Sequence, residues 1–303
     1  MSATFRTAVV RTPNGPDSIE IIEVPVVEPG PGQVRVDIAG ATVNPADLAV
    51  TDGFFHGIGI IDQPHHTGLG MDFAGIVDAA GPDVMDIPVG TRVAGIVEGF
   101  DRDFGTYAEK LVISATDIAV VPEGLDLATA ATVPLNSLTA AQIVDLLGDG
   151  AGRSLLVTGA AGAVGGYVLT FAQDRGWRVT GLARPADEEF VRTLGADFTA
   201  AATPGWDAVA DTAAFQEKGL ALVRDGGVFV GVRPGAEPPA ERGTTTYSVS
   251  VRPDSARLAE ILEDTATGRL PARVHALVPL DQVAAAHRAV ARGGVRGRYV
   301  LQP

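Results

Sequence analysis

Residues 154–166 decide the fold of this chain, and they read SLLVTGAAGAVGG. The first five form an apolar run of strand length, and the glycines that follow predict a tight turn into a helix. A phosphate group can approach the amide groups at a helix start only where side chains are absent, and the helix dipole adds to the attraction. The stretch therefore predicts a strand, a phosphate-binding turn and a helix.

This turn is similar to the dinucleotide-binding pattern G-x-G-x-x-G, with one departure. Ala160 stands at the first glycine, while Gly162 and Gly165 hold the second and third. Glycine turns also serve plain strand-to-helix packing, and this alternative stays open. The strands and helices around the turn favour a bound dinucleotide.

Strands and helices alternate on both sides of this turn, after Pro122. Apolar runs of strand length occupy residues 154–158, 178–182, 207–211 and 228–232. Amphipathic stretches between them occupy residues 164–174, 186–194 and 215–223. Such alternation predicts a parallel sheet covered by helices on both faces.

The chain from Arg6 to Val121 has a different texture, with short β-branched runs between Gly/Pro clusters. The runs occupy residues 19–24, 33–38, 75–79, 92–97 and 107–113. Their spacing predicts an antiparallel, β-rich domain. Residues 272–303 return to this texture around one helix, 280–291, and the run 297–301 is expected to pair in the first domain.

Composition excludes several function classes. The 303 residues predict about two domains. The formal net charge of −14 opposes nucleic-acid binding, and the absence of cysteine excludes disulfides, thiolate catalysis and Cys-ligated zinc. Without an apolar leader or membrane-spanning stretch, we expect a cytoplasmic protein with no membrane partner.

The end of the second parallel strand indicates which dinucleotide binds. NAD-binding domains usually place an acidic residue there for the ribose 2′-hydroxyl, yet no acid lies between Gly176 and Ala186. Arg184 stands where a 2′-phosphate would lie, and its guanidinium suits that anion. NADPH is therefore the predicted cofactor; the alternative is a solvated arginine at a strand end.

Six blocks in order resemble the zinc-less quinone oxidoreductase branch of the medium-chain dehydrogenase/reductase family. They are Val43-Asn44-Pro45-Ala46-Asp47, Gly70 to Val77, Gly105 to Glu109, Pro134 to Ala140, Gly195-Ala196-Asp197, and Ala286-His287 with Gly297 to Leu301. The resemblance implies an α/β protein with a GroES-like catalytic domain, residues 1–121 and 272–303, and an inserted Rossmann domain, residues 122–271. It also implies NADPH-dependent reduction of quinones or α,β-unsaturated carbonyls.

The resemblance also assigns roles to individual residues. It implies catalytic roles for Asn44, Asp47 and Thr139. It implies cofactor binding by Asn44, Thr139, Gly159, Ala160, Gly162, Ala163, Val164, Gly165, Arg184, Val230, Gly231 and Arg298. Plainer interpretations stay open, because Asn44 suits a turn, Asp47 a helix cap and Thr139 helix packing. Tyr107 suits a strand core better than a proton donor.

Departures from the family limit what carries over. Zinc alcohol dehydrogenases have G-H-E where this chain has Gly70-Met71-Asp72, so no metal site is expected. His65-His66 lacks H-x-x-x-H spacing, although His66 or Thr67 could line the substrate cleft. Some relatives carry Tyr and Arg at the positions of Ala49 and Thr51, and Arg298 replaces a lysine.

Three functions remain open at this stage. They are a general quinone or enone reductase, a biosynthetic tailoring reductase with a bulky polyketide-like substrate, and a non-catalytic NADPH-binding protein. The small residues Ala49 and Thr51 are consistent with a roomier cleft. The β-branched run 244–251 is expected at an edge of the parallel sheet, where relatives commonly dimerise, so a homodimer is predicted.

Overall fold

The computed structural model describes residues 3–303, which divide into two compact units. The first contains the chain up to Leu135 together with Arg252–Pro303, and the second is Asn136–Val251. The second unit is shorter at both ends than the predicted Rossmann domain. The segments on either side of it pack into the first unit, because α3 (Leu127–Ala131) contacts β3 and β5, and α8 (Ser255–Ala266) contacts β8.

Two β-sheets build the first unit. The smaller has the order β2-β1-β4, from β1 (Thr4–Val10), β2 (Ile19–Pro25) and β4 (Thr67–Gly68). The larger has the order β15-β16-β3-β5-β6-β8, with β7 also paired to β3. Its strands are β3 (Gln33–Thr42), β5 (Asp72–Ala80), β6 (Arg92–Ile96), β7 (Lys110–Ser114), β8 (Ile118–Val120), β15 (Val274–Pro279) and β16 (Arg298–Gln302). The pairing of β16 with β3 confirms that the late strand belongs to the first domain.

Alternation along β3 shows why this sheet forms. Val34, Val36 and Ile38 are buried, while between them Arg35 is partly exposed and Asp37 is exposed, and both form ion pairs. The period of two directs the apolar side chains to one face. The remaining helices of this unit are α1 (Pro45–Thr51), α2 (Phe54–Gly57) and α9 (Val283–Ala291), with short 3-10 turns at Pro16–Ser18, Ala115–Asp117 and Leu280–Gln282.

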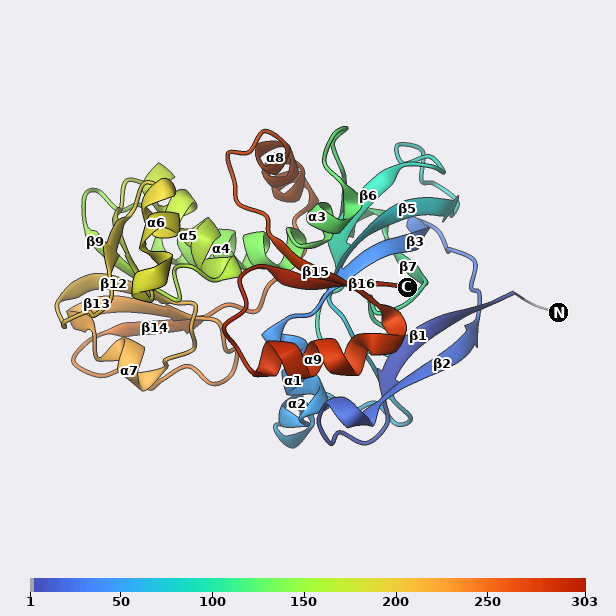
Figure 1. The fold of residues 1–303 in the computed structure, drawn as a ribbon, viewed down its shortest axis with the longest axis horizontal. Helices are drawn as coiled ribbons and strands as arrows, with labels where there is room; N and C mark the ends of the chain where they lie inside the picture. Colours follow the sequence, from blue (N-terminus) through green and yellow to red (C-terminus); the bar gives the residue numbers. More distant parts are fainter. Residues whose placement is uncertain (1–2) are drawn as a thin grey trace. The chain divides into compact units, whose positions relative to one another are not determined.

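One fully parallel sheet builds the second unit (Figure 1). Its strands are β9 (Ser154–Thr158), β10 (Arg178–Leu182), β11 (Asp197–Thr199), β12 (Trp206–Asp211), β13 (Val223–Gly231) and β14 (Thr245–Ser248). Their order is β11-β10-β9-β12-β13-β14, which is the doubly wound order of dinucleotide-binding sheets. The predicted α/β fold class is confirmed.

Helices cover both faces of this sheet. Figure 1 shows α5 (Ala163–Asp174) and α6 (Glu188–Thr193) on one side and α7 (Glu217–Leu220) on the other. Helix α4 (Pro134–Leu147) leads into the unit, and a 3-10 turn, Pro185–Asp187, precedes α6. The predicted helix over 215–223 was too long, because β13 already begins at Val223, which pairs with Trp206. Over residues 3–303 no helix has both the length and the apolar character to cross a bilayer.

Candidate functional site

The glycine turn between β9 and α5 has two positions that need glycine. Gly159 adopts a φ of +61°, which L-residues with side chains rarely take. A Cβ added to Gly165 would lie 2.3 Å from the carbonyl oxygen of Gly159, so α5 can start this close to the strand only without a side chain. Gly159 therefore makes the tight turn, and Ala160, at the predicted first glycine position, is buried beside it.

This turn fits the pyrophosphate of a dinucleotide. Helix α5 begins at Ala163, and its N-cap is Gly162, which brings no side chain over the first amide groups. The strand order reverses between β9 and β12, and ligands of such sheets bind beyond the carboxyl ends of the strands at that point. The turn therefore lies where doubly wound sheets of this order bind the phosphate groups of dinucleotides.

Other predicted cofactor residues belong to the same unit. Val230 and Gly231 end β13 and are buried, with Gly231 paired to Asp211 across the sheet. Thr139 lies within α4 and is also buried. Their roles toward a cofactor stay predictions.

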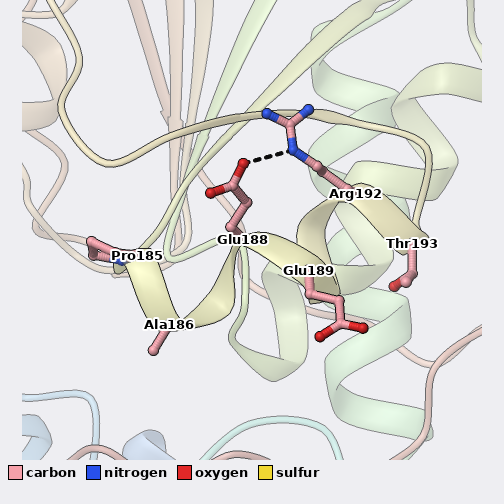
Figure 2. Close-up of a pocket in the computed structure, with 6 residues that line it drawn as sticks. All are labelled: Pro185, Ala186, Glu188, Glu189, Arg192 and Thr193. Atoms are coloured by element: carbon pink, nitrogen blue, oxygen red, sulfur yellow. Dashed lines mark hydrogen bonds and ion pairs between the residues drawn. The ribbon is translucent and has the colours of Figure 1, made fainter.

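The end of β10 presents Arg184 to solvent, with 61% of its side chain exposed. Its Nε lies 3.5 Å from a carboxylate oxygen of Asp187, whose side chain is 11% exposed. Beyond it lies a hollow lined by Pro185, Ala186, Glu188, Glu189, Arg192 and Thr193 (Figure 2). There Glu188 accepts a 2.8 Å hydrogen bond from Arg192, so that second guanidinium is already paired with a carboxylate.

In the first unit, Asn44 and Asp47 lie together where α1 begins. Pro45 opens the helix, and Asp47 accepts a 2.9 Å hydrogen bond from the backbone amide of Asn44. Asp47 also accepts from the amide of Gly70 at 3.2 Å. The interpretation of Asp47 as a helix cap is thus correct, and the cap fixes the backbone of Asn44.

A second carboxyl group completes a buried polar cluster. Asp72 Oδ1 accepts from the Thr42 hydroxyl at 2.5 Å and from Asn44 Nδ2 at 2.9 Å, while Asp72 Oδ2 has no hydrogen-bond partner. Burial, together with the charge of Asp47, raises the pKa of Asp72 to about 7. The Thr42 and Asn44 hydrogen bonds and the charge of Arg298 act in the opposite direction.

Asp47 shares this cluster but is better stabilised as an anion. Burial raises its pKa to about 6, against the hydrogen bonds from Asn44, Tyr107 and Gly70 and the charge of Arg102. Arg102 is partly buried, and desolvation lowers its pKa to about 10, while it donates to the Gly70 carbonyl at 2.6 Å. Burial raises the pKa of Tyr107 well above its usual value, so its hydroxyl keeps its proton.

The structure groups some predicted residues and adds others. Asn44, Asp47 and Arg298 belong to the first unit, and Arg298 acts electrostatically on Asp72. Sequence reasoning missed Thr42 and Asp72 as partners of Asn44, and it missed Asp187 as the carboxylate beside Arg184. Asp72 belongs to the family block Gly70 to Val77, and Asp187 lies three residues beyond Arg184. The sequence positions of both carboxylates could therefore have identified them.

His56, His66 and Thr51 also belong to the first unit and contact neighbouring residues. His56 Nε2 lies 3.2 Å from the buried Thr67 hydroxyl, and the His66 ring packs 5.4 Å from the ring of Phe104. Thr51 is fully buried and donates to the Leu48 carbonyl, so it offers no surface to a substrate. Among residues 3–303, no three His, Cys, Asp or Glu side chains are grouped as metal ligands.

Two family profiles match this chain. "Alcohol dehydrogenase GroES-like domain" matches residues 30–123, and "Zinc-binding dehydrogenase" matches residues 185–301. Together they span both units.

Named relatives and solved structures agree with these profiles. The NADPH-dependent alkenal/one oxidoreductase, chloroplastic, of Arabidopsis thaliana is 30% identical over 234 residues, covering 72% of this chain and 60% of that protein. Erythronolide synthase EryA2 of Saccharopolyspora erythraea is 35% identical over 184 residues, covering 60% of this chain and 5% of the synthase. The chain thus spans less than two thirds of either relative.

A solved structure supports the fold over the whole chain. The quinone oxidoreductase of Coxiella burnetii superposes with a TM-score of 0.87 at 23% identity, covering 99% of this chain and 100% of that one. The chain therefore belongs to the medium-chain dehydrogenase/reductase family, and the predicted resemblance to this family is confirmed.

Proposed function

We propose that this protein is an NADPH-dependent reductase of quinones or α,β-unsaturated carbonyls, acting by hydride transfer without a metal. The observation that carries the proposal is the glycine turn at Gly159–Gly165, with Arg184 at the end of the neighbouring strand β10. The names of the relatives, an alkenal/one oxidoreductase and a quinone oxidoreductase, support the substrate class.

The preference for the 2′-phosphate depends on Arg184. Its exposed guanidinium can make a charge-assisted hydrogen bond, worth roughly 1.5–3 kcal/mol, or about 10- to 150-fold in affinity. The first carboxylate after the strand, Asp187, lies beside that guanidinium and would be drawn away from a ribose hydroxyl by it. We therefore expect NADPH to bind more tightly than NADH.

Fluorescence titration of both cofactors tests this assignment. Arg184→Ala should weaken NADPH by about 10- to 150-fold and leave NADH nearly unchanged, because only NADPH carries the phosphate. Arg192→Ala is the matched control, since its guanidinium is held by Glu188 and its loss should affect neither cofactor. Equal loss of both cofactors in Arg184→Ala would assign Arg184 to the adenine or to loop packing.

Hydride addition to a conjugated carbonyl needs little from the protein beyond positioning. The cofactor supplies the hydride, and the side chains orient the reactants and manage charge on the carbonyl oxygen. In the first unit, Asp47 fixes the start of α1 and therefore the place of Asn44. Thr139 and the glycine turn are proposed to hold the cofactor, and Arg298 is proposed to help bind it.

A second candidate is a tailoring reductase with a bulky polyketide-like substrate. The match to a polyketide synthase favours it. A panel of naphthoquinones, alkenals and polycyclic quinones, followed by NADPH oxidation, separates the candidates. Turnover of simple quinones or alkenals supports the general reductase, turnover of bulky quinones alone supports tailoring, and cofactor binding without any turnover indicates a non-catalytic NADPH-binding protein.

Metal independence is a separate part of the proposal. It is motivated by a sequence with no cysteine and with Gly70-Met71-Asp72 in place of G-H-E. Activity should persist in a chelator, and purified protein should contain no stoichiometric zinc. A zinc ion required for turnover would refute it.

We also propose a homodimer that forms through β14. This strand is an edge of the parallel sheet, and Tyr247 on it is 41% exposed. An unpaired edge of β-branched residues can continue the sheet into a second copy. Light scattering at micromolar concentration should give twice the chain mass, and a monomer there would contradict the proposal.

A further inference from the structure

The loop after β12 carries a glutamine where the backbone favours glycine. Gln216 has a φ of +58° and a ψ of −119°, and the amide of Lys218 donates to the Phe215 carbonyl at 3.2 Å. These are the features of a type II′ turn with Gln216 at its second position, which glycine normally occupies. A residue with a side chain is strained at that position, so the backbone energy alone does not explain Gln216.

The backbone of this loop is bound to the strands beside the glycine turn. The Gln216 amide donates to Asp211 Oδ2 at 2.8 Å, and the Ala213 amide donates to the Thr158 hydroxyl at 3.2 Å. A Cβ added to Gly159 would lie 3.1 Å from the Cβ of Ala213. The loop after β12 therefore packs directly against the turn that follows β9.

The side chain of Gln216 extends in the other direction, to the loop after β13. Its Nε2 donates to the carbonyl of Ala236. Residues 233–236 form a tight turn, in which the Ala236 amide donates to the Arg233 carbonyl at 3.1 Å. A Cβ added to Gly231, the last residue of β13, would lie 3.7 Å from Gln216 Oε1. Gln216 therefore joins the loop after β12 to the loop after β13.

This link is also unfavourable at the far end of the side chain. Gln216 Oε1 is buried and has no hydrogen-bond partner within residues 3–303. Turning the carboxamide over would set Oε1 against the Ala236 carbonyl oxygen, and neither oxygen could donate a hydrogen. Gln216 thus combines a strained backbone with an unpaired buried oxygen. Strain of this kind clusters at ligand sites, where it holds loops in the geometry that binding needs.

The proposed function indicates which ligand these loops serve. With the 2′-phosphate at Arg184 after β10 and the diphosphate at the turn after β9, the rest of the dinucleotide extends toward β12 and β13. We propose that Gln216 is a positioning residue that holds the loop after β13, residues 232–236, in place for the nicotinamide half of the cofactor. This inference rests on the nicotinamide cofactor of the proposed function.

The experiment compares a whole cofactor with one half of it. Calorimetric titration, without substrate, gives the dissociation constants of NADPH and of adenosine 2′,5′-bisphosphate, which lacks the nicotinamide half. Gln216→Met keeps the length of the side chain and removes the N–H donor. It should weaken NADPH by about 2- to 13-fold, as expected for one lost hydrogen bond, and leave the bisphosphate unchanged. Where wild type prefers NADH, NADH and AMP make the same comparison.

Two further variants locate the cause of a selective loss. Gln216→Gly suits the type II′ turn and also lacks the donor, so it should weaken NADPH selectively even if Gln216→Met does not fold. Gln173→Met is the matched control in the same unit. Gln173 Nε2 donates to the carbonyls of Leu169 at 2.7 Å and Leu194 at 2.9 Å, and its loss should change neither constant. Circular dichroism checks the folding of each variant.

Each outcome decides the inference. A loss of NADPH affinity in both Gln216 variants, with the bisphosphate unchanged, supports it. Unchanged NADPH affinity overturns it, as does an equal loss of both ligands, which would give Gln216 a general role in folding. A loss in Gln216→Met alone also overturns it, because glycine lacks the donor too. Wild type that binds none of these nucleotides overturns the proposed function as well, whereas absent quinone turnover leaves the inference intact.

Discussion

The two units each contain a buried threonine–aspartate pair, and the pairs differ in one oxygen. In the first unit Thr42 donates to Asp72 Oδ1, and in the second Thr158 donates to Asp211 Oδ1, both at 2.5 Å. Both aspartates are fully buried. Asp211 Oδ2 accepts from the amide of Gln216 at 2.8 Å, whereas Asp72 Oδ2 has no hydrogen-bond partner.

This difference separates a pair that holds a loop from a pair that holds a side chain. Asp211 ties β9 to the loop after β12, and the Thr212 hydroxyl adds a 2.6 Å bond to the Thr158 carbonyl beside the glycine turn. Asp72 instead donates no such support to a loop: its Oδ1 accepts from Asn44 Nδ2, and its Oδ2 has no hydrogen-bond partner. Burial raises the pKa of this carboxyl group. The two pairs have the same residue types and the same burial. They differ in whether both carboxylate oxygens of the aspartate accept hydrogen bonds.

The largest loss of stability should come from substituting Asp211, the aspartate whose two oxygens both accept hydrogen bonds. Asp211→Ala leaves two buried donors, the Thr158 hydroxyl and the Gln216 amide, without an acceptor. At roughly 1–3 kcal/mol for each, the free energy of unfolding should fall by about 2–6 kcal/mol. Asp72→Ala should cost less, because it also removes a poorly solvated carboxyl group. Denaturant unfolding measures both, and a greater loss in Asp72→Ala would reverse the comparison.

Asp72, whose Oδ2 has no hydrogen-bond partner, should make the free energy of unfolding depend on pH. The folded pKa of Asp72, about 7, lies above its unfolded value, so the folded state holds the extra proton between about pH 4 and 7. Its contribution is present at low pH and is lost as pH rises through 7. The slope is at most about 1.4 kcal/mol per pH unit. Asp72→Asn lacks this titration, so the unfolding free energy of wild type minus that of the variant should fall as pH rises from about 4 to 7.

Other ionisable groups surround Asp72, and Asp47 and His287 titrate near the same pH range. Asp47, Tyr107, Arg102 and Arg298 interact within the cluster, and His287 packs on Tyr107 with its pKa lowered by burial to about 4. These groups are present in both wild type and Asp72→Asn. The difference between the two unfolding free energies therefore reports the titration of Asp72. A flat difference between pH 4 and 8 would show that Asp72 is ionised in the fold throughout.

The smallest effect concerns the loop that Asp211 holds. Ala214 has a φ of +56°, a conformation that costs a residue with a side chain roughly 1–2 kcal/mol. Ala214→Gly should relieve that strain and, after the added freedom of the unfolded chain, raise stability by up to about 1 kcal/mol. Ala213→Gly, at an ordinary φ, should lower stability by about 0.5–1 kcal/mol. Loss of stability in Ala214→Gly would mean that the loop is not strained.

The sequence predicts where the strands lie in each unit better than it predicts which residues of neighbouring strands face one another. The apolar runs 154–158 and 178–182 became β9 and β10 because burial on both faces leaves a plain signal. Asn44 and Asp47 were also predicted, since their motif is local. The partnership of Asn44 with Asp72 depends on how β3 pairs with β5, where Ala41 lies opposite Phe73. Register of that kind follows from packing of the whole sheet and is not written in either strand alone.

The pairing of β16 with β3 has a consequence for synthesis on the ribosome. Leu301 lies opposite Ala41, so the larger sheet of the first unit closes only after residues 252–303 have emerged. At about 5–20 residues per second, roughly 10–30 s separate the emergence of Leu135 from that of β16. The second unit is contiguous and can fold within that interval. We expect the early half of the first unit to wait with an open strand edge, a period in which chaperone binding competes with aggregation.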